Sequence, residues 1–416
     1  MTQYSKLNFW VLAAFGILFR LLFLPAIPNL SQDFYRFIWD GRLLNLGINP
    51  YVFTPQQLSN ADLPASSLTS LDAISNSSIL IKGMGGLNAS HYSNYPPINQ
   101  LCFALAGLLA KGSILGSVIG LRILMILADI GILYFGKKLL EKLKLPARNI
   151  FWYFLNPFII IELTGNLHFE GVMLLFLVWA LYLLHKDKWF WAAILLGISV
   201  SVKLLPLLLL PLFYKYLAPE GLFKKGFWIM KKFYWVVFGT IAITFAPFLS
   251  KVFLLNFGTT IGLWFQRFEF NASVYYIIRW IGFQSVGWNI IATVGLVLPL
   301  VVIACVIILT FFRKNQTTQQ LITGLLFAVS IYFLLSTTVH PWYVATPLLL
   351  SVFTKYKFAL VWSFMVFLSY AAYGAEGFNE NLALVAIEYS VVIAVVLLEL
   401  FQDSQTRNGS HRETIT

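Results

Sequence analysis

The sequence has few charged residues for its length. Only 11% of its 416 residues are Asp, Glu, Lys or Arg, whereas 59% are hydrophobic, and soluble domains carry about a quarter charged residues. The mean hydropathy of +0.78 agrees with this imbalance. A soluble globular protein is therefore excluded, and the sequence predicts an all-α, polytopic membrane protein.

Several other features are scarce or missing. Cys102 and Cys305 are the two cysteines, and both lie in apolar stretches, so a disulfide framework is not expected. No repeat of fixed period, heptad pattern or Gly-rich phosphate loop occurs. The net charge of +12 comes from short clusters between apolar runs, which argues against nucleic acid binding.

The apolar runs predict the membrane spans. About ten to twelve occur, and several approach the roughly 20 residues that cross about 30 Å of hydrocarbon. The first is interpreted as an uncleaved helix whose start is cytoplasmic. By the positive-inside tendency, five basic clusters should also be cytoplasmic; they are residues 137–148, 186–188, 224–232, 313–314 and 355–357.

The longest polar stretch, residues 28–96, follows the first span and should face outward. Its first third is aromatic, while residues 59–93 are rich in Ser, Asn and Gly, so we expect the chemistry in the first part. We predict a single membrane domain. Its catalytic module would be residues 1–285, and residues 286–416 would form C-terminal transmembrane helices.

Two regions do not fit simple crossings. Residues 189–214 are too few for two spans and contain Lys203 and two prolines, which predicts a broken, re-entrant hairpin with Lys203 near its tip, beside a central cavity. Residues 98–135 pose a parity problem. Either residues 98–110 are re-entrant, or the basic cluster at 137–148 lies outside.

An acidic helix is predicted at the start of the outer loop. Ser31 is a suitable N-cap, and the spacing of Asp33, Arg36 and Asp40 places them on one face. Neighbouring aromatic residues favour a juxtamembrane position, with Asp33 over the cavity mouth. The alternative is a surface helix with a solvated Arg36–Asp40 pair worth about 0.3–0.5 kcal/mol.

A second polar group follows Asn156-Pro157. Glu162, Asn166, His168 and Glu170 lie in a turn at the outer end of a short helix, and such a group is suited to hydrogen bonding with sugar hydroxyls. The alternative is a helix C-cap surrounded by solvated charges.

Charges inside apolar runs form a third set. Lys203 would cost roughly 2.5–3.5 kcal/mol near the bilayer centre, so it needs a partner such as an anionic phosphate; the alternative is snorkelling to the interface. Arg20 and the pair Arg122 with Asp129 are interpreted as structural contacts. Two later segments could also line the cavity; they contain Arg267 with Asn271, and His340 with Tyr343.

Taken together, these motifs resemble the GT-C superfamily of lipid-phosphate-sugar-dependent glycosyltransferases, especially the glycosylphosphatidylinositol mannosyltransferase and its bacterial relatives. Asp33 matches an essential Asp of the first outer loop in that superfamily, and Asp40 with Gly41 match the residues that follow it. The other matching segments are Tyr95-Pro96-Pro97, Asn156-Pro157, Gly165-Asn166 with His168, Val202-Lys203 with Pro206, and residues 270–275.

The resemblance implies a mechanism. A polyprenyl-phosphate sugar, with mannose favoured, would donate a hexose to a lipid- or glycan-type acceptor, and Asp33 would be the general base. Lys203, Arg36 and Arg267 would bind the donor phosphate, with Arg36 solvated. The residues expected to contact acceptor or sugar are Asp40, Glu162, Asn166, His168, Glu170, Asn271, His340 and Tyr343.

One departure concerns metal. The mannosyltransferase relatives carry two acids one residue apart, whereas this chain has Ser31 at the first position and only Asp33 at the second. No cofactor is therefore predicted with certainty, and a divalent cation is an alternative that this departure counts against.

The predicted location is a bacterial cytoplasmic membrane, with the active site facing outward. The absence of retention or targeting signals favours this over a eukaryotic membrane. A multipass transporter or lipid flippase is the main functional alternative, because intramembrane charges also line transport paths. A non-catalytic scaffold whose outer loop binds a partner is a third. Neither alternative involves glycosyl transfer.

Overall fold

The computed structural model describes residues 3–59, 74–221, 224–374 and 377–413. Helices dominate it, and the described residues contain a single antiparallel pair of two-residue strands, β1 (Tyr373–Gly374) and β2 (Gly377–Phe378). The all-α prediction is confirmed. The chain divides into two compact units, Met1–Trp264 and Phe265–Thr416, whereas the predicted functional boundary after residue 285 stays a prediction.

Long apolar helices in both units confirm the polytopic membrane character. Five helices in the described residues are long and apolar enough to cross a membrane, and residues 157–165 with 170–185 give a sixth if this bent pair is counted as one span. The five are residues 114–142, 225–248, 291–312, 318–335 and 382–405. The other apolar segments are shorter helices of 10–17 residues.

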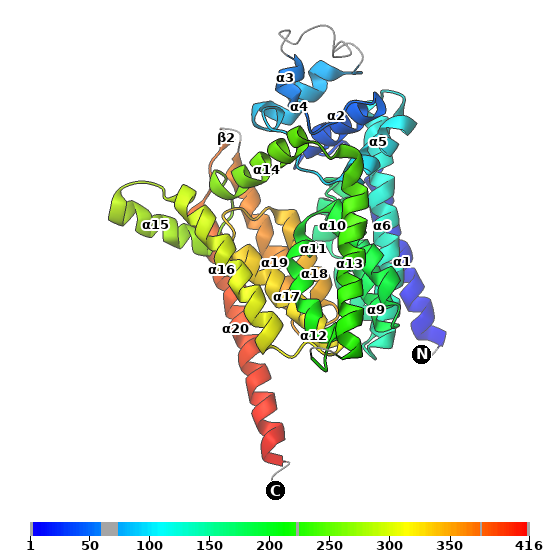
Figure 1. Cartoon of the computed structure of the whole chain (residues 1–416), viewed down its shortest axis with the longest axis vertical. Helices are drawn as coiled ribbons and strands as arrows, with labels where there is room; N and C mark the ends of the chain where they lie inside the picture. The colour runs from blue at the N-terminus through cyan, green and yellow to red at the C-terminus, as the bar shows by residue number, and fades with distance from the viewer. Residues whose placement is uncertain (1–2, 60–73, 222–223, 375–376, 414–416) are drawn as a thin grey trace. The chain divides into compact units, whose positions relative to one another are not determined.

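The first unit begins with α1 (Gln3–Leu22) and the elements of the outer loop. These are α2 (Asp33–Asn45), α3 (Pro55–Ser59), α4 (Ser77–Ala89) and α5 (Pro97–Ala110). Figure 1 shows α2, α3 and α4 together at one end of this unit, beyond the ends of the long helices α6 (Ile114–Lys142) and α13 (Lys225–Phe245).

The rest of the first unit is more broken. Between α6 and α13 lie η2 (Ala147–Ile150), α7 (Phe151–Phe154), α8 (Pro157–Ile159), η3 (Ile160–Gly165), α9 (Glu170–His185), α10 (Trp189–Val202), α11 (Leu205–Leu209), η4 (Leu210–Phe213) and α12 (Tyr214–Leu217). After α13 come η5 (Ala246–Phe248) and α14 (Lys251–Gln266).

Helix α5 packs along α2 over most of its length. Gly41 makes the approach close, since a Cβ there would lie 2.4 Å from the Phe103 carbonyl oxygen. At the far end of the pair, the Asn45 side chain donates to the Ala104 carbonyl at 3.0 Å. Fourteen residues span about 21 Å, less than the hydrocarbon core. Helix α6 is long enough to cross a membrane and α5 is not, while the choice between the two solutions of the parity problem stays a prediction.

The predicted hairpin at Lys203 is present. The backbone of Lys203 is extended (φ −144°, ψ 140°), and this residue is the C-cap of α10. The Tyr216 hydroxyl, just beyond the segment, donates to the Leu184 carbonyl, just before it, at 3.4 Å. Both ends of the segment thus lie at the same end of the unit, while Lys203 pairs with Glu170 at the start of α9.

Two arginines tie the first unit together. Arg20 of α1 donates to Asp129 of α6 at 2.7 Å, and both side chains are buried. Arg122 instead donates to the carbonyls of Thr164, Gly165 and Leu24 at 2.8–2.9 Å. The interpretation of these charges as structural contacts between helices is confirmed, because Asp129 binds Arg20 of another helix and Arg122 binds carbonyls outside α6.

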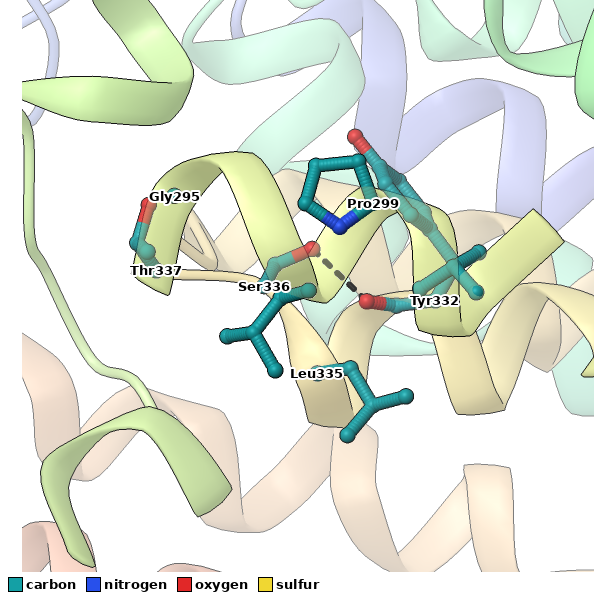
Figure 2. Close-up of a pocket in the computed structure, with 8 residues that line it drawn as sticks. Gly295, Pro299, Tyr332, Leu335, Ser336 and Thr337 are labelled. Carbon is teal, nitrogen blue, oxygen red and sulfur yellow. Dashed lines mark hydrogen bonds between the residues drawn. The ribbon is translucent and has the colours of Figure 1, made fainter. Parts of the chain in front are cut away.

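The second unit contains α15 (Val274–Val286), α16 (Ile291–Phe312), α17 (Thr318–Leu335), η6 (Pro341–Val344), α18 (Ala345–Ser351), α19 (Phe358–Met365), η7 (Val366–Ala372), the two strands and α20 (Leu382–Glu413). A mostly apolar pocket lies between α16 and the end of α17 (Figure 2). Ser336 in its lining donates to the Tyr332 carbonyl at 2.7 Å, so its hydroxyl is used within the fold. Both cysteines of the chain are free thiols.

Candidate functional site

Asp33 is the first residue of α2. The N-cap residue is Gln32, one position later than predicted, while the Ser31 hydroxyl still accepts a hydrogen bond from the Asp33 backbone N–H at 3.3 Å. An acid at this position is favoured by the helix dipole. The Asp33 carboxylate therefore lies in the first turn of α2, and the hydrogen bond to Ser31 fixes the backbone of this residue.

The next two charges of α2 form a buried ion pair. Arg36 Nε lies 2.7 Å from Asp40 Oδ1, and the two side chains are 2% and 0% exposed. Asp40 also accepts hydrogen bonds from Ser93 and from Gln100. The predictions of a solvated Arg36 and of a surface pair were wrong, because the rest of the outer loop folds over α2 and removes this face from water.

The second part of the outer loop supplies that cover. Arg36 Nη1 donates to the carbonyls of Asn88 and His91, each at 2.9 Å, and Ser93 Oγ reaches Asp40. Residues 88–93 thus help to position the charges of α2, while the expectation that the chemistry belongs to the first part of the loop stays a prediction. Asp62 and Asp72, also in this loop, lie outside the described residues.

Lys203, near the tip of the hairpin, forms an ion pair with Glu170 at the start of α9. The Glu170 side chain is 3% exposed and that of Lys203 is 22% exposed. The cost of a charge in an apolar span is therefore offset by a carboxylate within the protein, and part of the lysine side chain stays accessible.

The pKa of Asp33 depends on the charged groups described above. Burial raises the pKa of this carboxyl from 3.8 to about 6, and the positive charge of Lys203 opposes the rise. The negative charge of Glu170 raises the pKa further, while a hydrogen bond from Tyr95 and the charge of Arg36 lower it. Asp33 and Lys203 thus lie close enough to interact electrostatically.

Stacked aromatic rings hold the acidic helix against the start of α9. Phe37, one turn after Asp33, packs against Phe103 of α5 at 4.7 Å and against Phe169 at 5.6 Å between ring centroids. Tyr95 packs against Phe37 at 5.0 Å. Because Phe169 precedes Glu170, these contacts fix α2, the start of α5 and the Glu170 side chain relative to one another.

The polar turn before α9 is buried. Asn166 Nδ2 donates to Glu162 Oε2 at 3.3 Å, and His168 Nε2 lies 4.0 Å from the same oxygen. Glu162, Asn166 and His168 are at most 4% exposed, so the alternative of solvated charges around a C-cap was wrong. Asn166 nevertheless is the C-cap of η3.

The backbone of this turn is unusual. Residues Ile160–Gly165 form a π-helix, a conformation often found at functional sites. Leu167 has φ +66°, which strains a residue with a Cβ and a branched side chain. The helix axes on either side are bent by 113°. This strained bend directs Glu162, His168 and Glu170 inward.

The remaining predicted residues belong to the second unit. Asn271 is fully buried, and its side chain donates to Glu388 at 3.2 Å while its backbone N–H donates to Glu380 at 2.6 Å. His340 stacks on Trp342 at 4.5 Å and contacts Tyr343 at 5.4 Å. Arg267 is exposed. The backbone N–H of Phe270 donates to the Thr337 carbonyl, and the Val339 N–H donates to the Phe270 carbonyl. These bonds hold the segment that contains Asn271 beside the segment that contains His340.

Sequence reasoning missed several of these residues. Tyr95 was noted only as part of a motif, and Ser93, Gln100 and Glu388 were not singled out. Polar residues next to apolar helix starts were the available signal for Ser93 and Gln100. Within the described ranges, no group of three or more His, Cys, Asp or Glu side chains is arranged to hold a metal ion.

The region containing this arrangement is the part that known proteins share. Residues 10–219 match the family model described as alpha-(1->6)-mannopyranosyltransferase, N-terminal domain. The chain belongs to this family. The predicted resemblance to a membrane mannosyltransferase family is thereby confirmed, and the matched range includes both Asp33 and Lys203.

A curated member of the family gives a second comparison. The chain is 20% identical over 342 residues to alpha-(1->6)-mannopyranosyltransferase A of Mycobacterium tuberculosis. The aligned part covers 78% of this chain and 61% of that relative. This chain therefore spans less than two thirds of the length of the mannosyltransferase that it resembles.

Proposed function

We propose that the protein transfers a mannosyl residue from a polyprenyl-phosphate donor to a glycan or glycolipid acceptor, with Asp33 as the general base. The observation that carries this proposal is the association of a carboxyl whose pKa is about 6 with the Lys203–Glu170 pair. Family membership and the name of the relative support mannose as the sugar.

The charges of Asp33 and Lys203 suit the two groups that change in the reaction, the acceptor hydroxyl and the leaving phosphate. Asp33, ionised above pH 6, accepts the proton of the acceptor hydroxyl as that oxygen attacks the anomeric carbon. The bond between the anomeric carbon and the phosphate oxygen breaks, and the polyprenyl phosphate leaves with the negative charge. The ammonium group of Lys203, whose side chain is 22% exposed, is the group that stabilises this charge.

The other residues predicted to bind the substrates differ in whether the fold already uses their polar atoms. Arg36 is committed to Asp40 and to two carbonyls, so its contribution to phosphate binding is a positive field at Asp33 and not an exposed donor. Asp40 holds Arg36 and the loop in place. Glu162, Asn166 and His168 remain candidates for sugar contacts, and Arg267, Asn271, His340 and Tyr343 remain candidates from the second unit.

We also propose that the site faces outward from a bacterial cytoplasmic membrane. Arg42, near the end of α2, donates to the Gly112 carbonyl just before α6 at 2.7 Å. Helix α6 then runs for 29 residues, about 43 Å, and carries Lys137, Lys138 and Lys142 at its far end. Basic residues favour the cytoplasmic side, so the acidic helix and the lysines occupy opposite membrane faces.

The direct test is the Asp33→Asn variant. Transfer of radiolabelled mannose from polyprenyl-phosphate mannose should fall by about 10²- to 10⁴-fold, because the amide cannot accept the acceptor proton. Insertion and purification should be normal. Glu141→Gln, which removes an exposed carboxylate paired with Lys137, is the matched control and should retain full turnover. Turnover by Asp33→Asn at the wild-type rate would remove Asp33 from the mechanism.

A further inference from the structure

Asn99 has a buried side chain that the fold does not use. It lies in the first turn of α5 and is 0% exposed, and both its Nδ2 and its Oδ1 lack a hydrogen-bond partner among the described residues. The side chain does not cap the helix, whose N-cap is Pro96 without a side-chain hydrogen bond. A buried amide without partners is unfavourable, so a molecule outside the chain is needed to satisfy it.

The neighbouring residue shows the contrast. Gln100, next along α5, donates to Asp40 at 3.0 Å and to Ser93 at 2.8 Å. The fold therefore uses one carboxamide of this turn to fix the charges of α2. The adjacent carboxamide has no structural task among the described residues.

Asn99 lies beside the proposed site. Residues four apart share a helix face, which places Asn99 one turn before Phe103. The Phe103 ring packs on Phe37 at 4.7 Å and on Phe169 at 5.1 Å. These rings directly adjoin the turn that carries Asp33 and the residue Glu170, so the Asn99 amide belongs to the surroundings of the base and the ion pair.

Two nearby charged groups also have unused atoms. Arg36 Nη2 and Glu170 Oε2 are buried, and neither has a hydrogen-bond partner in the described part of the chain. Together with Asn99, they provide donors and acceptors around Asp33. A hexose presents adjacent hydroxyl groups, each of which both donates and accepts, and a carboxamide can bind two of them at once.

We propose that the side chain of Asn99 binds adjacent hydroxyl groups of the hexose that is transferred. This inference rests on the proposed function and extends it, because it assigns to α5 the recognition of the sugar. Asp33 and Lys203 act on the bonds that change, whereas Asn99 determines which sugar is held between them.

Binding of a soluble sugar phosphate tests this without turnover. The full-length chain in detergent would be titrated with mannose 1-phosphate and with glucose 1-phosphate, its epimer at C2, by calorimetry. In Asn99→Leu, the dissociation constant for mannose 1-phosphate should rise roughly tenfold or more, and the preference between the epimers should shrink. The thermal midpoint of the apo protein should stay equal or rise, because an apolar side chain replaces an unpartnered amide.

Asn45→Leu is the matched control. It removes another asparagine from the α2–α5 pair, one whose amide donates to the Ala104 carbonyl, and it should leave both dissociation constants unchanged. Failure of the wild type to bind mannose 1-phosphate, or binding by Asn99→Leu within about twofold of wild type, would overturn the proposal. In the latter case, an enclosed water is the partner of the amide.

The two proposals fail separately. Asp33→Asn tests proton transfer by turnover and should still bind mannose 1-phosphate, whereas Asn99→Leu is judged by binding and epimer preference. Retained turnover in Asp33→Asn would overturn the general-base assignment and leave the binding result for Asn99 standing.

Discussion

Two ion pairs of the first unit, Arg20 with Asp129 and Lys203 with Glu170, have different surroundings. Arg20 and Asp129 are 0% and 1% exposed. Arg20 also donates to the Gly16 and Phe154 carbonyls, and its guanidinium lies 4.2 Å from the Phe154 ring centroid. Lys203 and Glu170 are joined by a hydrogen bond as well, but the lysine keeps 22% of its side chain exposed.

This difference is the basis for treating the first pair as structural and for proposing a function for the second. Two backbone carbonyls and an aromatic ring contact the Arg20 guanidinium, and the arginine is fully buried. Lys203 has an exposed portion, lies at a break in a helix and acts electrostatically on an acid of another helix. Burial of a charge alone therefore does not identify a site; accessibility of the partner cation distinguishes the two.

The largest effect is expected from breaking the enclosed pair. Arg20→Met leaves Asp129 buried without its cation, which should lower the free energy of unfolding by about 3–5 kcal/mol. Denaturant unfolding in detergent would measure the loss. Arg20→Met combined with Asp129→Leu should recover much of it. Activity per folded molecule should stay near wild type, and a selective loss of turnover would contradict the structural assignment.

Lys203→Met tests the accessible pair and should have the opposite profile. Loss of the cation that stabilises the leaving phosphate should lower kcat by roughly 10²- to 10³-fold, with a smaller change in stability than for Arg20→Met. Lys137→Met, which removes an exposed lysine from its pair with Glu141, serves as the control. Equal losses of turnover in both lysine variants would show a general effect of charge.

A smaller effect concerns pH. Because the pKa of Asp33 is raised to about 6, kcat/KM should fall below pH 6 as the base is protonated, and a base with an ordinary pKa would give this limb near 4. Glu170→Gln should move the midpoint downward, since it removes a negative charge that raises this pKa. A midpoint unchanged in Glu170→Gln would contradict the proposed coupling.

The raised pKa of Asp33 also predicts how the stability of the fold depends on pH. Folding raises the pKa of Asp33, so the folded state holds this proton more tightly than the unfolded chain. The contribution of Asp33 to stability is fully present below pH 3.8 and is lost as the pH rises through about 6. Asp33→Asn should remove this component from the pH dependence of thermal unfolding.

Local chemistry made part of the site predictable. Lys203 stood out because a charge within an apolar run requires a reason, and Asp33 because it follows the first span directly. The hairpin followed from length, since 26 residues cannot cross twice. Such features depend on few residues, and the structure contains them.

Contacts distant in sequence were not predictable. Asp129 pairs with Arg20, 109 positions away, although Arg122 lies on the same helix face. Arg36 is buried because Asn88 and His91 fold back over it. Asn99 has no signal in the sequence, because an asparagine in a first helical turn usually makes local hydrogen bonds. Only packing shows that this one does not.

The close packing at Gly41 has a mechanical consequence. Because the Phe103 carbonyl oxygen lies where a Cβ at position 41 would be, the glycine lets α2 and α5 pack backbone against backbone. This contact sets the spacing between Asp33 of α2, the proposed proton acceptor, and Asn99 of α5, the amide that we propose binds the sugar. A single methyl group at this position would break that linkage without touching either residue.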